Sequence, residues 1–150
     1  LEEKHNVLIT GMTGTGKSYL ACAIGQQACR KGYRTVYRRA GRFYDELAHA
    51  KADGSLGRLL ARLAKIDLLV IDDFGLGAMR EGDRHGLLEV LEDRYGNRST
   101  IITSQLPPDA WHDYIHDPTV ADSICDRVIH NAHRVALKGE SRRKEKTTKN

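Results

Sequence analysis

Near its amino end the chain reads Gly11-Met12-Thr13-Gly14-Thr15-Gly16-Lys17-Ser18, directly after the apolar run Val7–Thr10 (VLIT). These eight residues match in full the pattern G-x-x-x-x-G-K-[ST] of a phosphate-binding P-loop. Val7–Thr10 is typical of a short buried strand, and Tyr19–Lys31 has apolar residues at helical spacing before Gly32. A glycine-rich loop between a strand and a helix is the context that this motif requires. The sequence therefore predicts a P-loop nucleotide-binding fold.

Each part of this loop has a physical role in holding phosphate. Glycines let the backbone curl so that successive N–H groups point inward, and the following helix turns its positive end toward the anion. We expect Lys17 to reach the β- and γ-phosphates of ATP and the Ser18 hydroxyl to bind Mg²⁺. The predicted cofactors are therefore ATP or ADP with Mg²⁺, and residues 11–18 are the predicted binding loop.

Two further strand ends carry polar side chains. Leu68–Ile71 (LLVI) is the most apolar run and predicts a strand covered on both faces, followed by Asp72 and Asp73. We expect Asp72 to hold Mg²⁺ through water and Asp73 to orient or deprotonate the attacking water. Thr100–Thr103 (TIIT) predicts a neighbouring strand, and Gln105 just beyond it is expected to sense phosphate or position water.

The remaining chain alternates between strand and helix patterns. Strands are predicted at Thr35–Arg38 and His133–Leu137, and helices at Gly41–Ala52, Leu56–Ala64, Arg84–Tyr95 and Thr119–His130. Such alternation predicts an α/β fold in three αβα layers, with a five-stranded parallel sheet between helices.

Composition excludes several other classes of protein. With 150 residues, 40% hydrophobic and 29% charged, the chain is long enough for one globular domain with a hydrophobic core. It contains no apolar run of membrane-spanning length, and we expect no signal peptide. Cys22 and Cys29 are interpreted as small core residues on one helix face, and reduced thiols favour a cytoplasmic protein.

Charge is unevenly distributed along the chain. The net charge is +4, and residues 138–150 alone, with six Lys or Arg and two Glu, account for all of it. This tail either contacts phosphate or is solvated, and the sequence leaves both readings open. We therefore divide the chain into an ATPase core at 1–137 and a basic tail at 138–150. Because it opens on Leu1, we expect a missing amino-terminal region of a longer protein.

Other nucleotide-dependent classes fit less well. Asp73-Phe74-Gly75 matches the kinase DFG, but the chain has no HRD catalytic loop, and kinases use a different glycine loop. A GTPase is disfavoured because no Asn-Lys-x-Asp guanine reader is present. His112 and His116 lack the glutamate of a zinc protease helix.

With these motifs placed, the chain resembles the ATPase domain of the IstB family, which assists insertion-sequence transposition. It is similar, more distantly, to the DnaC helicase loaders and DnaA initiators, all AAA+ ATPases. The resemblance rests on the strings GMTGTGKS, LAKIDLLVIDDFGL, LLEVLEDRYGNRSTIITSQLP and ADSICDRVIHNAHRVALKGESRR. It implies an AAA+ fold in which the helical lid is absent or minimal.

The resemblance also implies roles for single residues. Arg127 matches the arginine finger that completes a neighbouring subunit's site, Arg143 a second phosphate-sensing arginine, and Gln105 the first sensor. The extra helix before the acidic strand resembles the initiator branch, whose helices touch the backbone of double-stranded DNA. Candidates for that contact are Arg39, Arg42, Lys51 and Arg58. A solvated helix face is the other reading for each of them.

The function implied is a DNA-stimulated ATPase that assembles into an ATP-dependent oligomer on DNA and delivers target DNA to a transposase. Two alternatives stay open: a DnaC-like helicase loader, and a DNA scaffold in which ATP favours assembly and turnover is slow. A helicase-binding amino-terminal region would distinguish the loader. Turnover with and without DNA would distinguish the scaffold.

Overall fold

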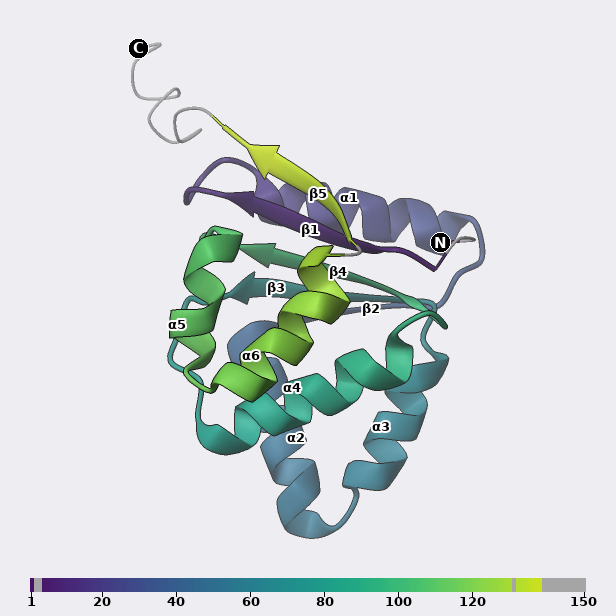
Figure 1. The fold of residues 1–150 in the computed structure, drawn as a ribbon. Helices are drawn as coiled ribbons and strands as arrows, with labels where there is room; N and C mark the ends of the chain where they lie inside the picture. Colours follow the sequence, from purple (N-terminus) through teal and green to yellow (C-terminus); the bar gives the residue numbers. More distant parts are fainter. Residues whose placement is uncertain (2–3, 131, 139–150) are drawn as a thin grey trace.

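The computed structural model describes residue 1, residues 4–130 and residues 132–138, and its centre is one parallel sheet (Figure 1). The strands are β1 Asn6–Gly11, β2 Thr35–Arg39, β3 Leu68–Phe74, β4 Ser99–Ser104 and β5 Ala132–Leu137. They pair in the order β2-β3-β4-β1-β5, and every pairing is parallel. The predicted five-stranded parallel sheet is confirmed.

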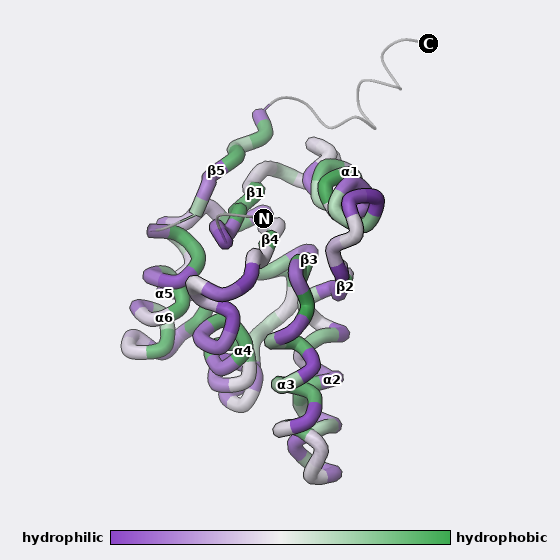
Figure 2. The backbone as a smooth tube through the Cα atoms, turned by 90° about the vertical axis from the view of Figure 1, so that its right-hand side faces the viewer, coloured by the Kyte–Doolittle hydropathy of each residue, from purple (hydrophilic) through white to green (hydrophobic). Residues whose placement is uncertain are grey.

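Helices cover both faces of this sheet, as the side view in Figure 2 shows. One face carries α1 Lys17–Arg30. The other carries α2 Ala40–Asp53, α3 Leu56–Lys65, α4 Glu81–Arg94, α5 Trp111–Ile115 and α6 Pro118–Cys125, with short turns at Pro108–Ala110 (3₁₀) and Asp126–His130 (π). The predicted αβα sandwich is therefore confirmed. Among the described residues, every helix is too short or too polar to cross a lipid bilayer.

Strand β3 separates two hydrophobic cores. Leu68 and Val70 pack with α1, whereas Leu69 and Ile71 face the larger core under α2 to α6. Successive side chains of a strand point to opposite faces, so a strand between two cores must be apolar at every position. This is why the run LLVI predicted a strand that is covered on both faces.

Some predicted boundaries differ from the structure. β3 continues through Phe74, so Asp72 and Asp73 lie inside the strand rather than after it. The predicted helix Thr119–His130 is broken into α6 and the π-helical turn, and α5 was not predicted. The expectation of a minimal lid concerns the chain after β5, where residues 139–150 lie outside the described part.

The interpretation of Cys22 and Cys29 as core residues is wrong, because both are exposed. The inward face of α1 consists of the small residues Ala21, Gly25 and Ala28, which allow the helix to approach the sheet closely. Each residue of a helix is rotated by about 100° from the one before it. Positions 22 and 29 therefore turn away from the core, while Cys125 on α6 is buried.

Candidate functional site

The parallel sheet brings the predicted site residues to one edge. The carboxyl ends of β1, β4 and β3 are neighbours, with Thr10 paired with Ser104 and Phe74 paired with the same residue from the other side. The loop after β1 and the two acids of β3 therefore lie at the same end of the sheet. This is the edge at which parallel α/β sheets bind ligands.

The P-loop has the backbone shape that its glycines allow. Gly14 and Gly16 have φ angles of 83° and 95°, in the left-handed region that other residues rarely adopt. Gly11 is required for space, since a Cβ there would lie 2.7 Å from Thr15 Oγ1 and 2.8 Å from the carbonyl oxygen of Leu137. The loop is thus a tight cradle next to the first turn of α1.

Lys17 is folded into this cradle. Its side chain is buried, and Nζ donates a hydrogen bond of 2.9 Å to the Met12 carbonyl oxygen, which also accepts from the Thr15 hydroxyl at 2.8 Å. Burial lowers the pKa of Lys17, and the nearby Asp73 and Asp72 carboxylates oppose that shift. A phosphate in the loop would offset the cost of burying this ammonium group.

Asp72 is almost completely buried and accepts hydrogen bonds from three hydroxyl groups. Ser18 Oγ lies 2.9 and 2.8 Å from its two carboxylate oxygens, Thr103 donates to Oδ1, and Tyr37 donates to Oδ2. Burial by itself raises the pKa of Asp72, but the hydrogen bonds from Thr103, Tyr37 and Ser18 outweigh it and hold the pKa below its ordinary value. The structure therefore places an ionised carboxylate against the serine predicted to bind the same Mg²⁺.

Asp73 has a backbone that few residues adopt. Its φ angle is 61°, which costs a non-glycine residue about 1–3 kcal/mol, and the β3–β4 register shifts between Ile71 and Phe74. Regular alternation would turn Asp73 into the larger core. Instead Phe74 enters that core and packs against Trp111, and the Asp73 carboxylate stays at the rim of the site.

The carboxylate of Asp73 is paired with Arg39, the last residue of β2. Arg39 Nη2 lies 3.2 Å from Asp73 Oδ2, and both residues line a cavity of about 490 Å³ that also includes Arg42. The four residues predicted to contact DNA do not all lie together, since only Arg39 and Arg42 line this cavity. Lys51 lies in the last turn of α2 against a separate groove, and Arg58 lies on the exposed face of α3.

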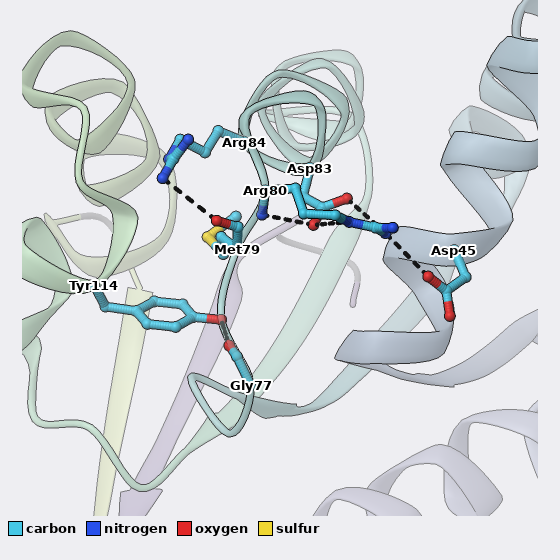
Figure 3. Close-up of polar contacts among 7 residues, drawn as sticks. All are labelled: Asp45, Gly77, Met79, Arg80, Asp83, Arg84 and Tyr114. Carbon is cyan, nitrogen blue, oxygen red and sulfur yellow. Dashed lines mark hydrogen bonds and ion pairs between the residues drawn. The ribbon is translucent and has the colours of Figure 1, made fainter.

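The loop that follows Asp73 is held from two sides, as Figure 3 shows. Tyr114 of α5 donates to the Gly77 carbonyl oxygen, and Arg80 bridges to Asp45 of α2 at 2.9 Å. Asp83 accepts from the backbone and side chain of Arg80 and so caps α4. This capping starts α4 at Glu81, earlier than predicted. Together, the contacts from Tyr114 and Asp45 fix the loop, and with it the end of β3 that carries Asp73.

Gln105 lies near the P-loop, and its role in sensing phosphate or positioning water stays a prediction. It is exposed immediately after β4 and lines a cavity of about 330 Å³ together with Gly11 and Met12 of the P-loop. Its side chain is therefore within the surroundings of the phosphate loop. Arg143 lies outside the described residues.

Arg127 lies at the opposite edge of the sheet from the P-loop. Its carbonyl oxygen accepts a 2.8 Å hydrogen bond from Asn6, the first residue of β1, and its guanidinium lies 4.6 Å from the ring centre of Tyr95. Ile124 and Val128 of the same segment face the core. Arg127 does not project freely from this segment, because the Tyr95 ring covers one face of its guanidinium. A residue at this edge is remote from its own P-loop.

Tyr37 and Thr103 were missed by the sequence reasoning. Thr103 both donates to Asp72 and accepts from the Asp73 amide at 2.9 Å, so it connects the two acids. Its signal was a hydroxyl residue at the carboxyl end of an otherwise apolar strand. Tyr37 had no comparable signal, since nothing in the order of residues shows which side chain reaches across from β2.

A helicase loader and a replication initiator are among the solved structures that share this fold. The DnaC helicase loader superposes with a TM-score of 0.76 at 22% identity, over 91% of this chain and 80% of that one. A replication initiator DnaA bound to AMPPCP and single-stranded DNA gives 0.77 at 23%, over 97% of this chain and 46% of that one. These likenesses show that the fold is that of the P-loop AAA+ proteins.

Relatives in sequence identify the family, whereas the solved structures show only the fold. The insertion sequence ATP-binding protein y4pL of Sinorhizobium fredii is 51% identical over 99% of this chain, and the IS1162 ATP-binding protein of Pseudomonas fluorescens is 55% identical over 71% of it. This chain covers 61% and 46% of their respective lengths. The family model of IstB-like ATP binding proteins matches residues 1–150. The chain therefore belongs to the IstB-like ATP-binding family, with a P-loop AAA+ fold.

Proposed function

We propose that this chain is the ATPase domain of a DNA-binding AAA+ protein that assembles on double-stranded DNA and delivers that DNA to a transposase. The observation that carries the nucleotide part is the contact of Ser18 with both oxygens of Asp72, beside the buried Lys17. The insertion-sequence names of the relatives support the transposase as client.

The residues fit ATP with Mg²⁺. The left-handed glycines leave room for phosphate against the loop backbone, and Ser18 with Asp72 supplies the hard oxygen ligands that Mg²⁺ prefers. When bound, Mg²⁺ would neutralise charge on the β- and γ-phosphates. Lys17 would donate to the same phosphates. Asp73 would orient the water that attacks the γ-phosphorus and accept its proton, as the bond to the bridging oxygen breaks.

The Arg39–Asp73 ion pair supplies a physical route for stimulation by DNA. A carboxylate that is paired with a guanidinium is held in one position and is less free to orient water. Arg39 is 62% exposed, so a DNA phosphate can compete for it. Binding of DNA would then release Asp73 for the reaction. Without DNA the same pair would keep basal turnover slow. The scaffold alternative differs because its turnover would stay slow with DNA present.

Helix α3 is the most suitable described element for contact with a DNA backbone. Its exposed side carries Arg58, Arg62 and Lys65, and the helix has no acidic residue. Positions separated by four and seven residues lie on one helix face, so the three cations form a stripe. Arg58 was predicted from the sequence, and the other two cations extend it. Phosphate contact of this kind needs positive charge and carries little sequence information.

Removing this stripe is expected to weaken DNA binding and flatten its salt dependence. Each phosphate contact contributes about 0.9 to the slope of log K against log salt, so the Arg58→Ala, Arg62→Ala, Lys65→Ala triple variant should lose roughly 2.7. Fluorescence anisotropy with duplex DNA at several salt concentrations measures it. The control variant Arg30→Ala, Lys31→Ala, Arg34→Ala removes the same charge near the end of α1 and should keep the wild-type slope. Equal losses in both variants would contradict the assignment.

The variant Asp73→Asn is expected to bind ATP with wild-type affinity and hydrolyse it about 10²- to 10⁴-fold more slowly. The amide keeps the shape of the side chain but cannot accept the proton of the attacking water. Release of phosphate, measured with saturating duplex DNA, gives the rate. Asp93→Asn, an exposed carboxylate near the end of α4, is the control and should leave the rate unchanged. Wild-type turnover by Asp73→Asn would exclude Asp73 from water activation.

A further inference from the structure

The phenol of Tyr37 reaches the Asp72 carboxylate from the edge strand β2. Tyr37 is paired with Val70, two residues before Asp72 on β3, yet its hydroxyl donates a hydrogen bond to Asp72 Oδ2. The ring must therefore extend along the strand by about two residues, or roughly 7 Å. Only a side chain of this length, with a donor at its tip, can make the contact from that position.

This contact is polar and is not part of core packing. Tyr37 is 39% exposed and belongs to neither hydrophobic core. The phenol hydroxyl donates its hydrogen bond to a carboxylate that is itself only 1% exposed.

The three donors to Asp72 are not equivalent. Ser18 contacts both carboxylate oxygens, whereas Thr103 contacts Oδ1 alone and Tyr37 contacts Oδ2 alone. A Ser18 hydroxyl that bound Mg²⁺ through its oxygen would still have only one proton, which it could donate to only one oxygen of Asp72 at a time. Thr103 and Tyr37 keep one donor on each oxygen, and this pair fixes the plane of the carboxylate. Without Tyr37, Oδ2 would have no fixed donor and the carboxylate could rotate about its remaining contact with Thr103.

We propose that Tyr37 is a positioning residue of the Mg²⁺ site, which acts by holding the Asp72 carboxylate at the angle needed to receive the metal-bound water. The inference rests on the proposed binding of nucleotide with Mg²⁺. Hydrogen-bond partners of groups that hold a metal typically contribute 10- to 100-fold to metal affinity. Tyr37 is expected to act on the metal and to leave the nucleotide's own contacts with the P-loop unchanged.

The test is the coupling between Mg²⁺ and nucleotide. Calorimetry measures the affinity of the full chain for AMPPCP with saturating Mg²⁺ and again with EDTA, and the ratio of the two affinities is the coupling factor. For Tyr37→Phe we expect the affinity in EDTA to equal that of the wild type and the coupling factor to fall about 10-fold or more. Tyr33→Phe removes a phenol hydroxyl just before β2, remote from Asp72, and should keep the wild-type factor.

The outcomes separate this inference from the proposed function. If the wild type shows a strong coupling factor and Tyr37→Phe shows the same factor, the role of Tyr37 is overturned. The proposed nucleotide site then still stands. Loss of affinity in EDTA as well would show a general structural effect and would also overturn it. A wild-type protein that binds no AMPPCP under either condition overturns the nucleotide site itself. Because the ring is retained, thermal melts of Tyr37→Phe and Tyr33→Phe should agree closely.

Discussion

Replacement of Lys17 by alanine is expected to weaken the binding of ATP by on the order of 100-fold or more. The ammonium group is buried in the loop and within hydrogen-bond distance of the Met12 carbonyl oxygen, so it is positioned to donate to phosphate without a large rearrangement. Hydrogen bonds to charged groups contribute about 1.5–3 kcal/mol each, and Lys17 would make at least two with the β- and γ-phosphates. A loss of about 3 kcal/mol corresponds to roughly 100-fold in affinity.

Calorimetric titration of ATP into each variant with Mg²⁺ present measures this loss. Lys31→Ala is the matched control, because Lys31 follows the opposite end of the same helix and is exposed. Its affinity should equal that of the wild type. Unchanged ATP affinity in Lys17→Ala would refute the assignment of the phosphate site to this loop.

Replacement of Arg127 by alanine is expected to leave ATP affinity intact and to reduce DNA-stimulated hydrolysis by about 10³- to 10⁵-fold, the contribution of an arginine finger supplied by a partner. The position of Arg127 explains why hydrolysis should fall while ATP affinity is kept. Arg127 lies beside Asn6 and Tyr95 at the amino ends of the strands, whereas the P-loop lies at their carboxyl ends. It is therefore too remote to assist its own nucleotide, and we expect it to act instead on the nucleotide of a neighbouring copy.

Mixing the two variants tests the action between subunits. Arg127→Ala keeps an intact P-loop and Lys17→Ala keeps an intact finger, so a mixed interface can combine both halves of one composite site. Partial recovery of hydrolysis in the mixture supports the assignment. Arg134→Ala, an exposed arginine of β5, should hydrolyse ATP at the wild-type rate. Full DNA-stimulated turnover by Arg127→Ala alone would show that Arg127 is not a finger.

The P-loop and the acidic strand were predictable because their signals are local. Glycines at fixed spacing, followed by Lys17 and Ser18, act through the backbone of one loop and the first turn of one helix. The run Leu68–Ile71 had to be apolar at each position because both its faces are covered. Parallel strands then bring their carboxyl ends together, which is why Ser18 and Asp72 could be assigned to one metal before their contact was seen.

The remaining features of the site depend on contacts between residues far apart in the chain. Tyr37 and Thr103 reach Asp72 from two different strands, and which side chains meet there depends on the register of β2 and β4 against β3. The left-handed backbone of Asp73 exists because Phe74 must enter the core against Trp111. In the same way, burial of α1 on its small residues turned Cys22 outward.

The sequence by itself thus determined the P-loop, the two acids beside it and the layered sheet that brings them together, since each follows from a short run of neighbouring residues. The tertiary structure alone decided which hydroxyl groups hold Asp72, that Arg39 pairs with Asp73, and that Tyr95 covers Arg127. Those outcomes depend on long side chains that cross between strands and helices. Their partners are selected by packing and register, which no local pattern of residues encodes.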